Sequence, residues 1–192
     1  MLIKENIVKI KNKDEEPFTL KSGKKSRLFI DIKEASLNPE ILDKIVDDII
    51  IYPHSPAMFD ICKREKQYRE KQNEWCIIGS VAIGAVPIAS VLSVKTGINQ
   101  VIVRSEKHDR GTQSQVIGNC NGKIVLLIED VATSGGSIVS AVRAIREVGG
   151  ICNDCIVVVD RQEGAERHCL DNGIHLISLL KKSDFGINLS EE

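Results

Sequence analysis

The sequence has almost no net charge. Its 26 lysines and arginines are balanced by 27 acidic residues, which leaves a formal net charge of −1. This balance excludes the extended basic field with which proteins attract nucleic acid. No apolar run approaches the about 20 residues that cross a membrane, and Met1 to Lys13 alternates lysine with isoleucine and valine rather than forming a signal-peptide core. We therefore expect a cytoplasmic protein that binds neither nucleic acid nor membranes.

The sequence also lacks a patterned set of cysteines. Cys152 and Cys155 form one C-x-x-C pair, but neither a second pair nor histidines at zinc-site spacing accompany it. The pair directly precedes the apolar run 156–159, which favours buried free thiols over a zinc site. In a cytoplasmic chain we expect all the cysteines to be free thiols. The six are Cys62, Cys76, Cys120, Cys152, Cys155 and Cys169.

Strand and helix patterns alternate over residues 75–180 and predict an α/β fold. With 192 residues, 42% of them apolar, the chain is long enough for a single domain with a substantial core. The alternation predicts a parallel sheet with right-handed crossovers and a site at its C-terminal edge. The predicted strands lie at 75–78, 100–103, 124–128, 155–160 and 174–180, and the predicted helices at 86–96, 137–148 and 161–172.

Outside this core the pattern is less regular. The interpretation there is a short helix and charged turn over 1–16, short strands at 18–20 and 28–31, a helix from Pro39 to about Tyr52, and a solvated surface helix over 63–74. Residues 114–119 are expected to pair with the start of the 124–128 strand.

The most informative stretch is Lys123 to Ser137. The five apolar residues of 124–128 are typical of a buried parallel strand, and the acidic pair Glu129 and Asp130 follows where that strand is predicted to end. A loop of small and hydroxyl residues, 133–137, then leads into an amphipathic helix with Ile138, Val142, Ile145 and Val148 on one face. Backbone N–H groups of such a loop converge on an anion at a helix N-terminus, and its glycines allow close approach. The stretch predicts a ligand with a phosphate and sugar hydroxyls; the alternative is an ordinary strand–turn–helix unit.

This stretch resembles the phosphoribosyl pyrophosphate (PRPP) signature of the type I phosphoribosyltransferases. The resemblance implies their fold: a central parallel sheet flanked by helices, with a small N-terminal hood over 1–35 and a PRPP-binding α/β core over 75–180. It implies that PRPP is held by Glu129, Asp130, Val131, Ala132, Thr133, Ser134, Gly135, Gly136 and Ser137.

Four further segments resemble the orotate phosphoribosyltransferases, particularly their archaeal members. They are 18–31, 79–87, 103–112 and 159–165. In that family the first segment lies over the orotate ring, the second holds pyrophosphate, the third is a mobile catalytic loop, and the arginine of the fourth binds the orotate carboxylate. The resemblance therefore implies orotate binding by Lys21, Phe29, Thr133 and Arg161. The planar guanidinium group of Arg161 can donate two parallel hydrogen bonds to a carboxylate, which supports its assignment to orotate. The alternative for Arg161 is a surface residue that caps the next helix, and the alternative for Lys21 is an exposed lysine with no role in binding.

The loop at 104–111 departs from the family pattern. Arg104, Asp109 and Gly111 match it, but Ser105 and His108 replace its two lysines. Lys107 lies one position before the second replaced lysine, and Arg110 takes the place of a histidine or tyrosine. Positive charge is thus partly kept while its placement changes.

Together these resemblances imply transfer of phosphoribose from PRPP to orotate, giving orotidine 5′-monophosphate and pyrophosphate in pyrimidine biosynthesis. They imply Glu129, Asp130, Lys107 and His108 as catalytic and Arg104 and Arg110 as PRPP-binding. They also imply Mg²⁺ carried by PRPP rather than by protein ligands, and a homodimer. Two alternatives remain open: a phosphoribosyltransferase for another base, and a PRPP-binding regulatory homologue, which the altered loop favours.

Overall fold

The computed structural model of the chain describes residues 8–11, 14–19, 25–26, 28–51, 76–104 and 114–185. Within them, six strands form one sheet in the order β10-β9-β8-β5-β6-β7. All run parallel except β7, which is antiparallel to β6 at one edge. The predicted α/β fold with a mostly parallel sheet is confirmed. The strands are β5 (Cys76–Val81), β6 (Gln100–Val103), β7 (Val116–Ile117), β8 (Ile124–Ala132), β9 (Ile151–Asp160) and β10 (His175–Lys181).

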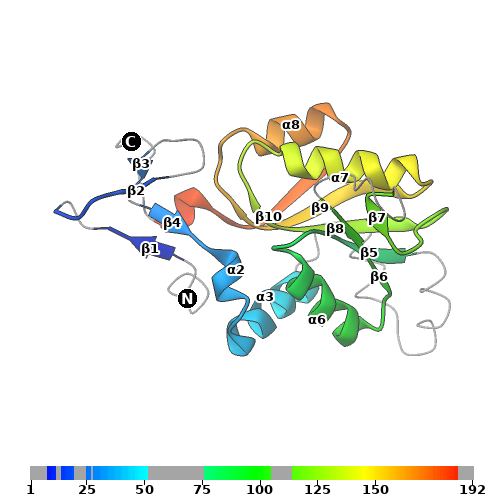
Figure 1. Cartoon of the computed structure of the whole chain (residues 1–192), viewed down its shortest axis with the longest axis horizontal. Helices are drawn as coiled ribbons and strands as arrows, with labels where there is room; N and C mark the ends of the chain where they lie inside the picture. The colour runs from blue at the N-terminus through cyan, green and yellow to red at the C-terminus, as the bar shows by residue number, and fades with distance from the viewer. Residues whose placement is uncertain are drawn as a thin grey trace.

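Helices cover both faces of this sheet (Figure 1). The helices α7 (Gly136–Glu147) and α8 (Ala165–Asp171) lie on one face; α2 (Ile32–Ala35), α3 (Pro39–Ile51) and α6 (Val86–Thr96) lie on the other, and a 3-10 turn, η2 (Lys182–Phe185), follows β10. Successive residues of a strand point to opposite faces of the sheet and so belong to two hydrophobic cores. In β8, Leu127 packs with α7 and α8, whereas Leu126 packs with α3 and α6. Burial on both faces explains the unbroken apolar run of β8.

The strand order places a topological switch between β5 and β8. These strands are neighbours in the sheet, but the chain leaves β5 through α6 toward β6 and leaves β8 through α7 toward β9, on the opposite side. In open α/β sheets the connections diverge at such a point and leave a crevice outside the carboxyl ends of the strands. The loops after β5 and β8 are therefore the parts of the fold that are placed to hold a ligand.

Four short strands precede the sheet. Strand β1 (Val8–Ile10) pairs antiparallel with β4 (Leu28–Ile30), and β2 (Phe18–Thr19) pairs with β3 (Lys25–Ser26). The rings of Phe18 and Phe29 lie 5.3 Å apart and join the two pairs. The predicted helix over 1–16 is therefore wrong at residues 8–10, where the apolar–polar–apolar alternation has the period of a strand and β4 supplies the partner.

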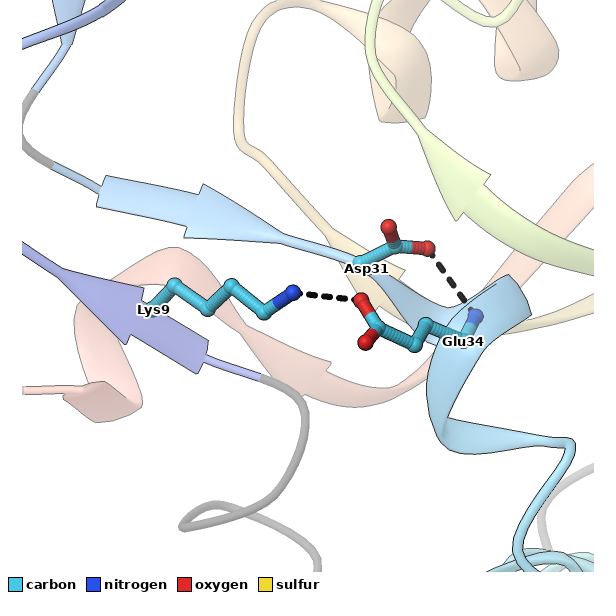
Figure 2. A network of polar contacts seen from close by, with 3 residues as sticks. All are labelled: Lys9, Asp31 and Glu34. Atoms are coloured by element: carbon cyan, nitrogen blue, oxygen red, sulfur yellow. Dashed lines mark hydrogen bonds and ion pairs between the residues drawn. The ribbon is translucent and has the colours of Figure 1, made fainter.

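A small polar network fixes the start of α2 (Figure 2). Asp31 caps the helix, with its Oδ1 accepting a hydrogen bond from the Glu34 backbone N–H at 3.0 Å, and the Glu34 carboxylate forms an ion pair with Lys9 of β1. Because α2 also contacts β8, this network connects the N-terminal strands to the central sheet.

Other expectations need correction. The strand β8 continues through the acidic pair to Ala132, because β9 runs beside it as far as Asp160. Residues 116–117 pair with β6 rather than with the start of β8. The helix predicted over 161–172 begins only at Ala165, since Gln162 and Gly164 have φ values of +57° and +102° that end any continuous helix. The surface helix expected over 63–74 lies outside the described residues.

The cysteines of the C-x-x-C pair are free and buried in β9, as predicted. Burial raises the pKa of Cys152 to about 12, so the thiol stays protonated. Among the described residues no group of three or more His, Cys, Asp or Glu side chains could hold a metal ion. None of the helices in this part of the chain combines the length and apolarity needed to cross a membrane.

Candidate active site

Two carboxyl groups are buried near the end of β8. Glu129 and Asp130 are 6% and 4% exposed, and Glu129 Oε2 accepts no hydrogen bond from the described residues. Lys33 of α2 places its Nζ 2.9 Å from Asp130 Oδ2. Buried charges are stable only when they are paired, and Lys33 supplies the positive charge that faces the buried Asp130 carboxyl group.

Glu129 carries a proton at neutral pH. Burial, followed by the hydrogen bond and the negative charge of Asp130, raises the pKa of Glu129 to about 9, and the positive charge of Lys33 opposes this only in part. At neutral pH Glu129 is therefore protonated and can donate a hydrogen bond, while the Asp130 carboxyl group beside it is paired with Lys33 and offers acceptor oxygens. Such a pair can bind neighbouring hydroxyl groups of a sugar.

The loop that follows β5 lies against this pair. A Cβ atom on Gly84 would lie 2.0 Å from Asp130 Oδ2, so only glycine allows the backbone to approach the carboxylate this closely. The loop belongs to the segment 79–87, for which the family resemblance implies pyrophosphate binding. It reaches the acids because β5 and β8 are adjacent at the topological switch.

The loop from Thr133 to Ser137 leads from the end of β8 into the N-terminus of α7. Its residues are exposed apart from Gly135, which has φ +79° and begins α7 with no side-chain cap among the described residues. The first N–H groups of α7 therefore remain available to an anion, and the helix dipole favours negative charge there. Contacts with α8 fix the loop: Ala165 backbone lies 3.2 Å from where a Gly135 Cβ would be, and His168 Nδ1 lies 2.9 Å from the Ser134 carbonyl oxygen.

Arg161 lies at the same sheet edge. Its backbone N–H donates to the Ala132 carbonyl oxygen at 2.9 Å, which places it beside the end of β8, and its Nη2 lies 3.0 Å from Glu163 Oε1. The side chain is 17% exposed. The turn is fixed by the buried Asp160, whose Oδ1 accepts a hydrogen bond from the Gln162 backbone at 2.8 Å. The arginine is thus fixed next to the end of β8 with a half-buried side chain, rather than on a free surface loop.

The structure brings together only part of the predicted site. The acids, the loop 133–137 and Arg161 converge where β8 and β9 end. Arg104 follows β6 on the far side of β5, with its backbone N–H bonded to the Gln115 carbonyl at 2.9 Å. Phe29 packs on Phe18 in the N-terminal strands. The predicted site residues Lys21, Lys107, His108 and Arg110 lie outside the described residues, as does Ser105.

Comparisons with known proteins identify the family of the chain. The phosphoribosyl transferase domain family matches residues 50–177. The orotate phosphoribosyltransferase of Methanopyrus kandleri is 40% identical over 167 residues, which cover 87% of this chain and 81% of that protein. This chain belongs to the orotate phosphoribosyltransferases. The Methanocaldococcus jannaschii enzyme of the same name is 39% identical over 164 residues, covering 85% and 83% of the two chains.

Solved structures of orotate phosphoribosyltransferases share the fold. The crystal structure from Aeropyrum pernix has a TM-score of 0.76 and 25% sequence identity, and covers 96% of both chains. The Mycobacterium tuberculosis enzyme in complex with PRPP has a TM-score of 0.67 and 25% identity, and covers 97% of this chain and 95% of that one. The predicted family and type I phosphoribosyltransferase fold are confirmed.

No sequence pattern marks Lys33 as a residue of the site. The lysine comes from a four-residue helix and meets Asp130 only through the tertiary fold. One pattern, Asp31-x-x-Glu34, resembles a capping box and would have indicated a helix start there. Gly84 lay within a segment that the sequence did single out, but its contact with Asp130 could not be read from that segment alone.

Proposed function

We propose that the chain transfers the phosphoribosyl group of PRPP to N1 of orotate, giving orotidine 5′-monophosphate and pyrophosphate. The observation that carries this proposal is the buried acidic pair directly before a helix N-terminus that no described side chain caps, at the switch point of a mostly parallel sheet. A sugar phosphate needs these two features together: an anion cradle and, next to it, groups for the sugar hydroxyls.

In this proposal the residues from Val131 to Ser137 bind the 5′-phosphate through backbone N–H groups and hydroxyls. Glu129 donates to one ribose hydroxyl and Asp130 accepts from the other. As the bond to pyrophosphate breaks, positive charge develops on the ribose, and the anionic Asp130 stabilises it from a pocket that excludes bulk water. The loop around Gly84 receives the pyrophosphate end.

Mg²⁺ fits the site as part of the substrate. Magnesium is commonly bound by substrate phosphates with one or two carboxylates and several waters. The described residues offer only the acidic pair at this position, with Asp130 paired to Lys33. We therefore assign the metal to the pyrophosphate group, where it offsets the charge of the leaving group.

Orotate binding is assigned to the rim of the crevice. The guanidinium of Arg161 offers two parallel donors to the orotate carboxylate, and would exchange Glu163 for it. Phe29, Lys21 and Thr133 would lie around the ring. Arg104, with Lys107, His108 and Arg110, would close over the pyrophosphate and exclude water that could hydrolyse PRPP.

For the whole molecule, we propose one domain over 1–192, in which residues 1–35 form a hood over the base and 75–180 form the PRPP-binding core. Family resemblance supports a cytoplasmic homodimer.

Replacing Asp130 by asparagine tests the acidic pair directly. The variant should keep the fold, because the amide occupies the same volume, but lower PRPP-dependent turnover by at least about tenfold, or about 1.4 kcal/mol of transition-state free energy. Asp47→Asn is the matched control, since Asp47 is ion-paired with Lys95 on α3 and α6. Wild-type turnover of Asp130→Asn at saturating PRPP and Mg²⁺ would overturn the assignment.

A further inference from the structure

We propose that Lys33 is a substrate-exchanged cation of the active site: it pairs with Asp130 before PRPP binds and transfers to the pyrophosphate group of PRPP when the ribose hydroxyls take its place. This inference rests on the proposed function and adds to it a residue, a movement and a ligand group.

The ion pair joins a mobile group to a fixed one. The Lys33 side chain is 57% exposed, whereas that of Asp130 is 6% exposed. The carboxylate is confined by β8 and by Gly84, while the lysine has a flexible four-carbon stem with room to move. If the pair separates, the lysine is therefore the partner that moves.

Chemistry requires the pair to separate during the reaction. Asp130 stabilises positive charge on the ribose only if its own charge is not already neutralised. An ammonium group left at 2.9 Å would cancel that charge and repel the developing cation. Lys33 stays protonated throughout: burial lowers its pKa, but the hydrogen bond and negative charge of Asp130 outweigh this and raise it overall.

The geometry also indicates where the ammonium goes. Lys33 Nζ and Gly84 converge on the same atom, Asp130 Oδ2, with the lysine at 2.9 Å and a Gly84 Cβ position at 2.0 Å. The loop that carries Gly84 receives the pyrophosphate in the proposed function. The phosphate oxygens there would be the nearest new anions for a lysine displaced from Asp130.

The backbone of Lys33 stays in place during this exchange. Asp31 caps α2, and Lys9 of β1 holds Glu34 of the same helix (Figure 2). Only the side chain needs to turn. The catalytic loop has serine and histidine, Ser105 and His108, where the family has lysines. A cation delivered from α2 would add to the positive charge that this loop keeps only in part.

Calorimetric titration with three ligands separates this exchange from a purely structural role. Magnesium PRPP and magnesium pyrophosphate carry the group that Lys33 would bind, and ribose 5-phosphate does not. In Lys33→Met we expect PRPP and pyrophosphate to bind about tenfold more weakly, the cost of one charge-assisted hydrogen bond. Ribose 5-phosphate should bind as in wild type or more tightly, because nothing competes for Asp130. Lys33→Arg should restore pyrophosphate binding to within about threefold of wild type.

Lys95→Met is the matched control, since it removes a lysine that bridges Asp43 and Asp47 away from the site. It should change none of the three affinities by more than about twofold. Equal weakening of ribose 5-phosphate and pyrophosphate in Lys33→Met would overturn the exchange, and so would unchanged affinities, failed rescue by arginine, or absence of pyrophosphate binding in wild type. A wild-type protein that binds these ligands as expected but forms no orotidine 5′-monophosphate would refute the proposed function alone.

Discussion

Replacing Gly84 by alanine should displace Asp130 and thereby lower the catalytic rate. The added Cβ would lie 2.0 Å from Asp130 Oδ2 and 2.4 Å from its Cγ, whereas real Cβ contacts stay beyond 3.0 Å. The carboxylate or the loop must therefore move by about 1 Å, and a misplacement of that size costs about 10²-fold in rate. This corresponds to about 2.7 kcal/mol of transition-state free energy.

The assay is kcat/KM for PRPP at saturating orotate and Mg²⁺, measured together with the melting temperature. Gly150→Ala is the control, because its Cβ would crowd Ile145 Cγ2 at 2.7 Å in the core, away from the acids. The control should lose about 1–3 kcal/mol of folding stability from overpacking and keep its kcat/KM. A folded Gly84→Ala protein with kcat/KM within about threefold of wild type would refute the contact on which the site rests.

Three further predictions follow from the site. Arg161→Ala should raise KM for orotate by about tenfold or more, because a charge-assisted pair is lost, and should change KM for PRPP far less. Equal increases in both KM values in steady-state kinetics would mean that Arg161 stabilises the fold and does not bind orotate. Because burial beside Asp130 raises the pKa of Glu129 from 4.5 to about 9, the folded protein holds a proton that the unfolded chain releases, so the free energy of unfolding should fall as pH rises across that interval. Between pH 5.5 and 8.5 the free energy of unfolding of Glu129→Gln should fall less steeply with pH than that of wild type, as measured by thermal melting at each pH. Equal slopes for the two proteins would contradict this pKa. Chelation of divalent metal should abolish turnover and leave the melting temperature unchanged, whereas a fall of several degrees would make Cys152 and Cys155 metal ligands.

The elements that sequence predicted well are those with strong local patterns. Helix α7 was expected at 137–148 and spans Gly136–Glu147, and β10 was expected at 174–180 and spans His175–Lys181. Only Val148 was misplaced, because it lies past the last turn and is 38% exposed instead of joining the inner face. The spacing of apolar residues repeats over several turns of such a helix, so the sequence alone predicts the element without knowledge of the tertiary fold.

Short elements depend on partners far away in the chain. Strand β1 has three residues and helix α2 has four, too few for a periodic signal, and each is stabilised through contacts such as the one between Lys9 and Glu34. The choice of β6 rather than β8 as the partner of β7 is equally non-local. Propensity alone could not resolve these cases, because tertiary pairing overrides it.

The candidate site divides in the same way. Its acids and anion-binding loop are contiguous in sequence, so their chemistry was visible in one stretch. Lys33 and Gly84 reach Asp130 from two other elements, and only the fold shows that all three meet at one oxygen atom. The protonation of Glu129 likewise depends on burial that no sequence pattern states.

Product formation tests the central claim most directly. The purified protein should be incubated with PRPP, Mg²⁺ and either orotate, uracil, adenine or hypoxanthine, with nucleotide and pyrophosphate measured by mass spectrometry. We predict orotidine 5′-monophosphate and pyrophosphate in equal amounts, with orotate preferred over uracil by about tenfold or more, since uracil has no carboxylate to replace Glu163 at Arg161. Nucleotide formed from another base at a higher kcat/KM than from orotate, or no nucleotide from any base, would contradict the account.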